Sequence, residues 1–308
     1  MKMTFEIIRR RNITQRILVL VVLIAFVVSW AGWERAPAFA EEKIVRIALA
    51  TKLRNFDPHK TIATHERAVQ QNIFDTLTEL DRNYRPVPSL AVSWKYLNDT
   101  TLEVKLRRGV KFHNGQPFTS DDVVFTYDRI LKSKPAVRIF SWIRGTMKNV
   151  EKVDDFTVRI TTPRTYAPLL ANLTRFHILP AKAFKEMGEK KFARNPVGTG
   201  PFQFVSWTVG QKTILKAFKG HWRKGIPKVD GAEFRIIPDE FGRFAALKAG
   251  EVDIVQNLPA ARISAAKKDS NITVKSVWGQ RNMWLGLMIN PPLDNVLVRR
   301  ALNYAVDK

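Results

Sequence analysis

The sequence predicts a mixed α/β protein with a β-rich segment inserted into it, and two patterns carry that prediction. Alternating apolar and polar residues, which are typical of strands, are concentrated between residues 86 and 194. On either side, strand-like runs and helix-like runs follow one another along the chain. The 308 residues are 45% apolar and 26% charged, a balance typical of a folded chain and too apolar for a disordered one.

The first forty residues have the three parts of a secretory signal peptide. Arg9, Arg10, Arg11 and Arg16 form a basic head, an unbroken apolar run spans Ile17–Val28, and Ala38-Phe39-Ala40 is a small-x-small cleavage pattern. A membrane-spanning helix needs about 20 apolar residues, so an uncleaved anchor is the weaker alternative. We expect cleavage after Ala40 and export to the periplasm, and the absence of cysteine argues against a lipoprotein.

The composition is strongly basic and contains no cysteine. Lys and Arg number 51 against 28 Asp and Glu, a formal net charge of +23. The basic residues are scattered, without a basic arm or a zinc-finger spacing, so we expect no nucleic acid as a partner. A generally basic proteome, or attraction to an anionic membrane surface, is the simpler explanation of the charge. Without cysteine, a thiolate-ligated metal and a thiol nucleophile are both excluded.

The chain opens with a strand, a loop and a helix. The apolar run Ile44–Ala50 predicts a buried strand, and Asn55–Pro58 predicts a loop because proline disfavours helix in the residue before it. A helix is expected from Thr64, and Arg85–Pro88 breaks the pattern. The helix prediction depends on apolar residues at four-residue spacing, namely Val69, Ile73 and Leu77.

The next stretch is rich in strand signals. Thr101–Arg107 alternates between apolar and polar residues, and Phe156, Val158 and Ile160 mark a second alternating strand. Asn114-Gly115 predicts a tight turn. Thr119–Asp122 matches a capping box and predicts the start of a helix, whose apolar side would hold Val123, Tyr127, Ile130 and Leu131.

From about Asn195 strands and helices alternate again. A helix is predicted over Asp239–Ala249, with Phe241, Phe244, Ala245 and Lys248 at helical spacing and Gly250 as its stop. A final helix is predicted over Asp294–Lys308, with Leu297, Ala301 and Tyr304 on one face. The predicted strands are Thr213–Phe218, Ala232–Ile237, Val252–Val255, Ile272–Val277 and Met283–Ile289.

Catalytic and metal-binding patterns are missing from the sequence. The five histidines lack metal-ligand spacing, and there is no phosphate-binding loop or nucleophile elbow. Asp121-Asp122 has two interpretations, an acid/base pair or acids that stabilise the first turn of a helix, and the second is favoured. We therefore expect no enzyme, no cofactor and no resident metal.

Several stretches, in the same order, carry a family resemblance. The longest is residues 89–131, SLAVSWKYLNDTTLEVKLRRGVKFHNGQPFTSDDVVFTYDRIL. Further stretches are NPVGTGPFQFVSW at 195–207, FKGHWRKGIPKVDGAEFRIIPD at 218–239, LKAGEVDIV at 247–255 and VRRALNYAVDK at 298–308. In them the sequence resembles the extracellular solute-binding proteins of peptide and nickel ABC importers, known as family 5.

The resemblance implies a periplasmic binding protein-like two-lobe fold with a β-rich subdomain inserted into the first lobe. After the signal peptide, residues 1–40, lobe one would comprise residues 41–85 and 195–290, and the insert residues 86–194. Residues 291–308 would begin lobe two. In the family VRRALNYAVDK belongs near the start of lobe two, so most of that lobe would be missing. We therefore expect the segment 41–308 to bind peptides only weakly.

The resemblance places the solute between the lobes. In the first lobe, Arg281 would pair with a carboxylate and Trp278 would cover an apolar side chain. The alternatives are an exposed, salt-bridging arginine and a core tryptophan. The positions expected to face the cleft are Asn55, Phe56, Asp57, Thr199, Gly200, Trp278 and Arg281.

The resemblance also implies a function. The chain would be the substrate-binding component of an ABC importer, a monomer that captures di- or oligopeptides, or a related small solute, and delivers them to the permease subunits in the membrane. Two alternatives stay open. One is a nickel or metal-chelate binding protein of the same family, and the other is a secreted enzyme with no recognisable catalytic motif.

Overall fold

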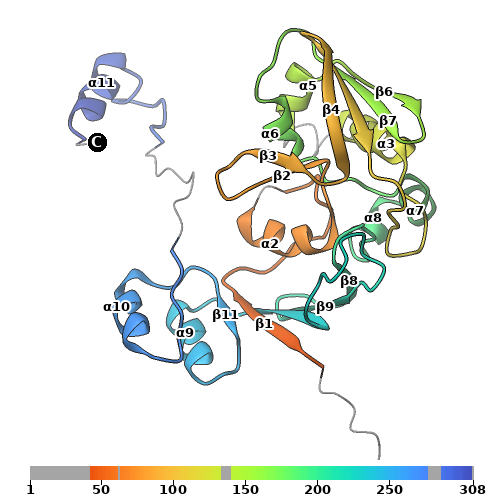
Figure 1. The fold of residues 1–308 in the computed structure, drawn as a ribbon. Coiled ribbons are helices and arrows are strands. Elements are labelled where there is room, and N and C mark those ends of the chain that lie inside the picture. The colour runs from red at the N-terminus through yellow and green to blue at the C-terminus, as the bar shows by residue number, and fades with distance from the viewer. Residues whose placement is uncertain (1–41, 62, 133–139, 277–285, 307–308) are drawn as a thin grey trace, which may run out of the picture. The chain divides into compact units, whose positions relative to one another are not determined.

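The computed structural model describes residues 42–61, 63–132, 140–276 and 286–306 (Figure 1). The predicted signal peptide lies outside these residues, as do Trp278 and Arg281. The chain divides into two compact units, one ending at Asn257 and one beginning at Leu258. Each unit is described by itself.

A five-stranded sheet forms one part of the first unit, in the order β11-β1-β10-β9-β8 (Figure 1). Strand β1 (Ile44–Leu49) lies between β10 (Gly231–Ile236) and β11 (Ile254–Val255), and is parallel to both. Strands β9 (Lys212–Ala217) and β8 (Phe202–Thr208) continue the sheet in antiparallel fashion. The predicted opening strand is confirmed, although only its last two residues are fully buried.

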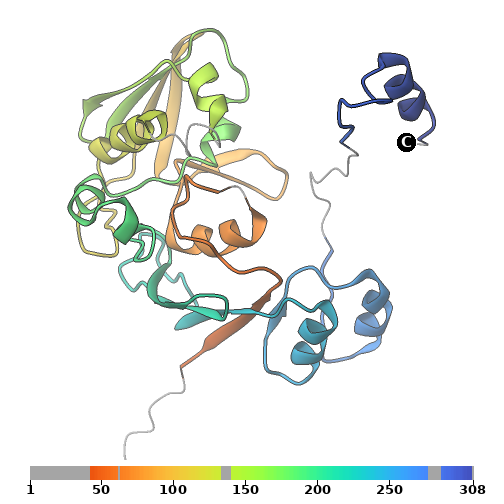
Figure 2. The same ribbon diagram turned by 180° about the vertical axis from the view of Figure 1, so that it is seen from behind.

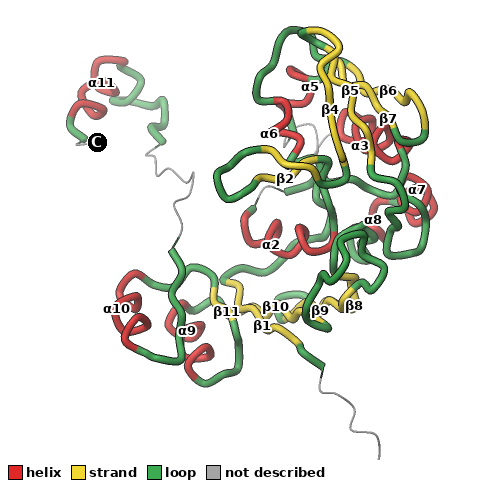
Figure 3. Tube along the Cα trace, in the orientation of Figure 1, coloured by secondary structure: helices red, strands yellow, loops and turns green. Residues whose placement is uncertain are grey.

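The second sheet of this unit is antiparallel and has the order β4-β5-β7-β6, drawn in yellow at the top of Figure 3. Its strands are β4 (Ala91–Asn98), β5 (Thr101–Leu106), β7 (Thr157–Thr161) and β6 (Asn149–Asp154). The predicted alternation is confirmed, because Leu102, Val104, Leu106, Val158 and Ile160 are all buried. The apolar face packs against helix α3 (Ser120–Lys132).

Shorter elements connect the two sheets. Helix α2 (Thr64–Ile73) lies between the five-stranded sheet and the small hairpin β2–β3 in both views (Figures 1 and 2). The hairpin consists of Thr78–Leu80 and Pro86–Pro88. The remaining helices among the described residues of this unit are α5 (Ser141–Thr146), α6 (Leu169–Leu173), α7 (Ala181–Met187), α8 (Glu189–Phe192) and α9 (Glu240–Lys248).

Local capping signals explain where the helices begin and end. The Asp122 carboxylate accepts the backbone N–H of Thr119 at 2.9 Å, which is half of a capping box, and also the N–H of Ala181 at 2.8 Å. Burial raises the pKa of Asp122 to about 6. In α9 the Asp239 carboxylate caps Gly242 N–H, and Gly250 follows the helix with φ +72°. The predicted stop at Gly250 is therefore confirmed.

Two predicted strands are wrong where the structure describes them. Residues 272–276 and 286–289 are not strands, although Ile272-Thr273-Val274-Lys275 alternates. An alternating run becomes a strand only when a neighbouring strand hydrogen-bonds to it, and none of the described strands does so here. The rest of both predicted ranges lies outside the described residues.

The described residues of the second unit form two short helices. Helix α10 (Ala260–Lys268) was not predicted, because its alanine-rich sequence has no clear apolar stripe. Helix α11 (Val296–Tyr304) is shorter than the predicted Asp294–Lys308, and Asn295 caps its start. Its expected apolar face is exposed, with Leu297 65% and Tyr304 88% exposed. No helix among the described residues has the length and apolarity to cross a bilayer.

The turn geometry at Gly115 predicts how substitutions there change stability. Its φ is +85°, and nothing lies within 4 Å of the position a Cβ would take. We expect Gly115→Val to lower the free energy of unfolding by roughly 1–2 kcal/mol through backbone strain alone. Gly115→Asn should cost less, because asparagine tolerates positive φ better. Urea unfolding of both variants checks this, and equal costs would show that the strain is not conformational.

Candidate functional site

The loop that follows β1 is held by interior contacts. Asn55 is half-buried, and its Oδ1 accepts the backbone N–H of Asp57 at 2.9 Å, which forms a local turn. Phe56 is fully buried and meets the rings of Phe204 and Trp207 edge-on, at centroid distances of 5.1 and 5.2 Å. These contacts fix the path of the loop without a bound solute.

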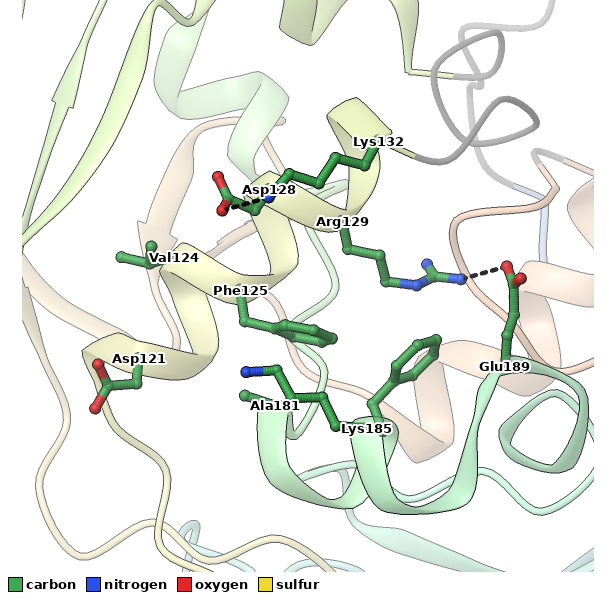
Figure 4. Close-up of a pocket in the computed structure, with 10 residues that line it drawn as sticks. Asp121, Val124, Phe125, Asp128, Arg129, Lys132, Ala181, Lys185 and Glu189 are labelled. Atoms are coloured by element: carbon green, nitrogen blue, oxygen red, sulfur yellow. Dashed lines mark hydrogen bonds and ion pairs between the residues drawn. The ribbon is translucent and has the colours of Figure 1, made fainter.

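A buried ion pair joins this loop to helix α3, which packs on the inserted sheet. Asp57 is fully buried, and both of its carboxylate oxygens accept hydrogen bonds from the guanidinium of Arg129, on α3, at 3.2 and 2.5 Å. Such a two-pronged contact is stronger and more directional than a single hydrogen bond. Arg129 Nη2 also donates to Glu189 Oε1 at 3.1 Å (Figure 4), and its guanidinium lies 4.5 Å from the ring centre of Phe184.

His59 completes the cluster as a neutral side chain. Its Nε2 lies 2.9 Å from the carbonyl oxygen of His177, which can only accept, so Nε2 carries the proton. Its Nδ1 is then free to accept from Arg129 Nη1, 2.8 Å away. Burial and the positive charge of Arg129 lower the pKa of His59 to about 3. Lys60 pairs with Glu189 at 3.0 Å, so acids and bases alternate through the cluster.

The Gly198–Pro201 loop is packed even more closely. A Cβ on Gly198 would lie 2.0 Å from the carbonyl oxygen of Ile73, and one on Gly200 would lie 2.6 Å from the carbonyl carbon of that residue. The Gly200 N–H donates to the Ile73 oxygen at 2.9 Å, and His113 hydrogen-bonds to the carbonyls of Gly198 and Gly200. Thr199 between them is fully buried. The Gly-Thr-Gly sequence is thus explained by close approach to the end of α2.

A second buried polar cluster lies beside this loop. Trp222 Nε1 donates to Asp75 Oδ2 at 2.9 Å, and His221 Nε2 is 3.8 Å from the same oxygen. Burial alone would raise the pKa of Asp75, but interactions with His221 and Trp222 outweigh it and lower that pKa. The guanidinium groups of Arg107 and Arg223 lie 4.2 and 4.4 Å from the Trp222 ring.

The structure therefore brings two groups of the predicted site residues into the interior of one unit. Phe56, Asp57, Thr199 and Gly200 are buried, and their role as solute contacts stays a prediction. Arg129, Glu189, Asp75 and Trp222 were missed. Each is brought to these loops from a distant part of the sequence, a relation that local periodicity does not encode. Among the described residues, no three His, Asp or Glu side chains gather so as to hold a metal ion.

Comparison with known proteins gives the family. Residues 85–308 match the family described as bacterial extracellular solute-binding proteins, family 5, middle. The chain belongs to this family. The α/β fold expected of such a protein, with its inserted β-rich sheet, is confirmed by solved periplasmic binding proteins of similar structure.

Three similar proteins differ in the solutes they are named for. The glutathione-binding protein GsiB of Pectobacterium atrosepticum is 29% identical over 90% of this chain and 54% of its own length. Heme-binding protein A of Haemophilus influenzae is 34% identical over 80% of this chain and 49% of its own. The solved structure of MoaA from A. tumefaciens R10, in complex with mannopinic acid, is 30% identical, with a TM-score of 0.74 over 86% of this chain and 56% of its own. The chain spans about half the length of these relatives.

The ion pair between Arg129 and Asp57 predicts a large loss of stability on mutation. Arg129→Met would leave the fully buried Asp57 carboxylate without its cation, so we expect the free energy of unfolding to fall by roughly 3–5 kcal/mol. The matched control is Arg159→Met on the inserted sheet, whose partly exposed pair with Glu103 should contribute less than about 1 kcal/mol. Urea unfolding measures both, and a similar small loss for the two variants would contradict the structural role of Arg129.

The buried histidines predict a loss of stability in mild acid. Burial lowers the pKa of His59 and His177 to about 3 and of His113 to about 4, so all three stay neutral in the folded chain while the unfolded chain takes up protons near pH 6.5. Each histidine should therefore lower the free energy of unfolding by roughly 2 kcal/mol between pH 7 and pH 5. Asp122 has the opposite effect between pH 6 and 4. Its raised pKa lets the folded chain bind a proton at a higher pH than the unfolded chain does, which increases stability as the pH falls. Unfolding at pH 7 and pH 5 checks the net loss, and equal or greater stability at pH 5 would contradict it.

Proposed function

We propose that this chain captures a small peptide, or a related solute with a carboxylate, in the periplasm for an ABC importer. Membership of the solute-binding family supports the importer role. Glutathione, for which one relative is named, is itself a tripeptide. Heme and mannopinic acid, named for the other two, also carry carboxylates. A strongly basic chain is suited to such solutes, because its field attracts anions.

The topology of the five-stranded sheet supports one location for the solute. Strands β1, β10 and β11 are parallel, so their carboxyl ends meet at one edge of the sheet. The backbone contact between Ile237 N–H and the Leu49 oxygen, 2.9 Å, shows that the chain segments leaving β1 and β10 are neighbours. In open α/β sheets, ligands bind outside the carboxyl ends of the strands. We therefore place the solute at this edge.

The side chains at this edge suit binding. Thr51 and Lys52 follow β1 and are exposed, and Arg54 is held by Glu66, whose carboxylate accepts from its backbone N–H at 2.8 Å and from its side chain. The Arg54 side chain stays 68% exposed despite this pair. The buried groups behind the edge, Asp57 and Arg129, are occupied by each other. They support a surface that offers polar and basic groups to a solute.

Two alternatives have less support. A nickel or metal-chelate solute would be favoured by converging histidines or carboxylates, and the described residues hold no such group of three or more. A secreted enzyme would need a catalytic constellation, and the relatives that match this chain are named as binding proteins. The physical process we propose is the closure of two lobes around the solute, in which the solute supplies contacts that the open state lacks.

The test uses the full chain after export and saturation-transfer NMR, which detects weak binding. We expect transfer to tripeptides, glutathione among them, and not to neutral sugars. Lys52→Ala at the sheet edge should reduce the peptide signal, whereas Lys95→Ala on the inserted sheet should leave it unchanged. Transfer to nickel–histidine or heme without transfer to any peptide would overturn the peptide proposal.

A further inference from the structure

Figure 4 shows a groove between α3 and α7, and none of Thr51, Lys52 and Arg54 at the sheet edge discussed above lines it. Its volume is about 800 Å³, within the roughly 300–1,000 Å³ of small-molecule sites. One face of α3 supplies six of its lining residues, and α7 with the start of α8 supplies the rest. They are Asp121, Val124, Phe125, Asp128, Arg129, Lys132, Ala181, Phe184, Lys185 and Glu189.

The groove has an aromatic floor. The rings of Phe125 and Phe184 have centroids 5.5 Å apart and planes inclined by 53°, and both side chains are only half-buried. Val124 and Ala181 extend the apolar surface beside them. Half-buried rings that meet at an angle leave an apolar face on which a further flat ring can pack.

Charge pairing leaves one cation in this groove unmatched. Asp121 pairs with Lys152 at 2.9 Å, and Asp128 pairs with Lys132 at 3.2 Å. Glu189 is neutralised by Lys60 and Arg129, as shown above. Lys185, by contrast, forms no ion pair with any carboxylate of the described residues. Its Nζ lies 5.5 Å from the ring centre of Phe125.

We propose that this groove is a second binding site, for a small aromatic carboxylate. The aromatic body would pack on Phe125 and Phe184, and the carboxylate would accept a hydrogen bond from Lys185 Nζ. A cation at the border of an aromatic floor, with every neighbouring acid already paired, selects an anion with a flat apolar body over a neutral ring or a cation. This site shares none of Thr51, Lys52 and Arg54 with the solute site proposed at the carboxyl edge of the parallel strands, although Arg129, which lines the groove, pairs with Asp57 behind that edge.

The first experiment compares charged and neutral rings of one shape. Benzoate and benzamide are titrated against the full chain after export, by ligand-observed NMR at up to about 10 mM. We expect benzoate to bind at least roughly fivefold more tightly, a difference that corresponds to about 1 kcal/mol. Raised salt should narrow the difference, because the groove is open to solvent. Equal binding of the two ligands, or no binding of benzoate, would overturn the proposal.

Variants on α7 supply the second experiment. Lys185→Met keeps the apolar stem of the side chain and removes the charge, so it should abolish the preference for benzoate. Lys182→Met is the matched control, because Lys182 lies on the same helix, 3.9 Å from Glu186, and does not line the groove. Ala181→Leu should weaken both ligands by filling the groove. A Lys185→Met variant that binds benzoate like the unmodified chain would overturn the role of this lysine.

A third comparison separates this site from the proposed function. Tripeptide binding should be unchanged in Lys185→Met, and benzoate binding should be unchanged in Lys52→Ala. If peptides fail to bind while benzoate binds with the expected dependence on Lys185, the groove proposal is supported and the peptide proposal is overturned. If Lys52→Ala removes benzoate binding and Lys185→Met does not, benzoate occupies the sheet edge and the groove proposal is overturned.

Discussion

The contact between Arg129 and Asp57 is the interaction on which the arrangement of the first unit depends. It joins residues 72 positions apart, one on a helix of the inserted subdomain and one in the loop after the first strand. Removing two charges from water is costly, and the cost is offset here because both carboxylate oxygens, His59 and Glu189 all accept from the same guanidinium. These contacts hold the loop after β1 against α3.

The Gly198–Pro201 loop applies a second constraint of a different kind. Steric closeness fixes it, since its two glycines touch the end of α2 where any side chain would clash. Val197, just before it, packs against the apolar core of the inserted sheet and also against the core beneath the five-stranded sheet. Charge pairing at one loop and close packing at the other hold the two sheets in a single compact unit.

Local patterns were sufficient for much of the fold. The strand at 101–107, the capped helix after Thr119 and the glycines at 115 and 250 were all predicted from neighbours in sequence, because alternation, capping and positive φ are local properties. Arg129 could not be predicted as a buried cation, since its partner lies in another subdomain. The alternation at 272–275 wrongly predicted a strand, because a strand forms only where a neighbouring strand hydrogen-bonds to it. Phe241, which has helical spacing in α9, is 48% exposed. Arg243 is buried instead, and its guanidinium donates to the carbonyls of Ile237 and Pro238.

The position of β1 has a consequence for the order in which the chain folds. Its neighbour β10 pairs with it through residues such as Ile44 and Gly231, so the five-stranded sheet cannot close until most of the chain has been synthesised. The strands of the inserted sheet are much closer in sequence, with a β5–β7 side-chain contact spanning only 52 residues. Short loops cost less entropy to close than long ones, so we expect the inserted sheet to form first. Until β10 and β11 have been synthesised, β1 has no strand to pair with on either side.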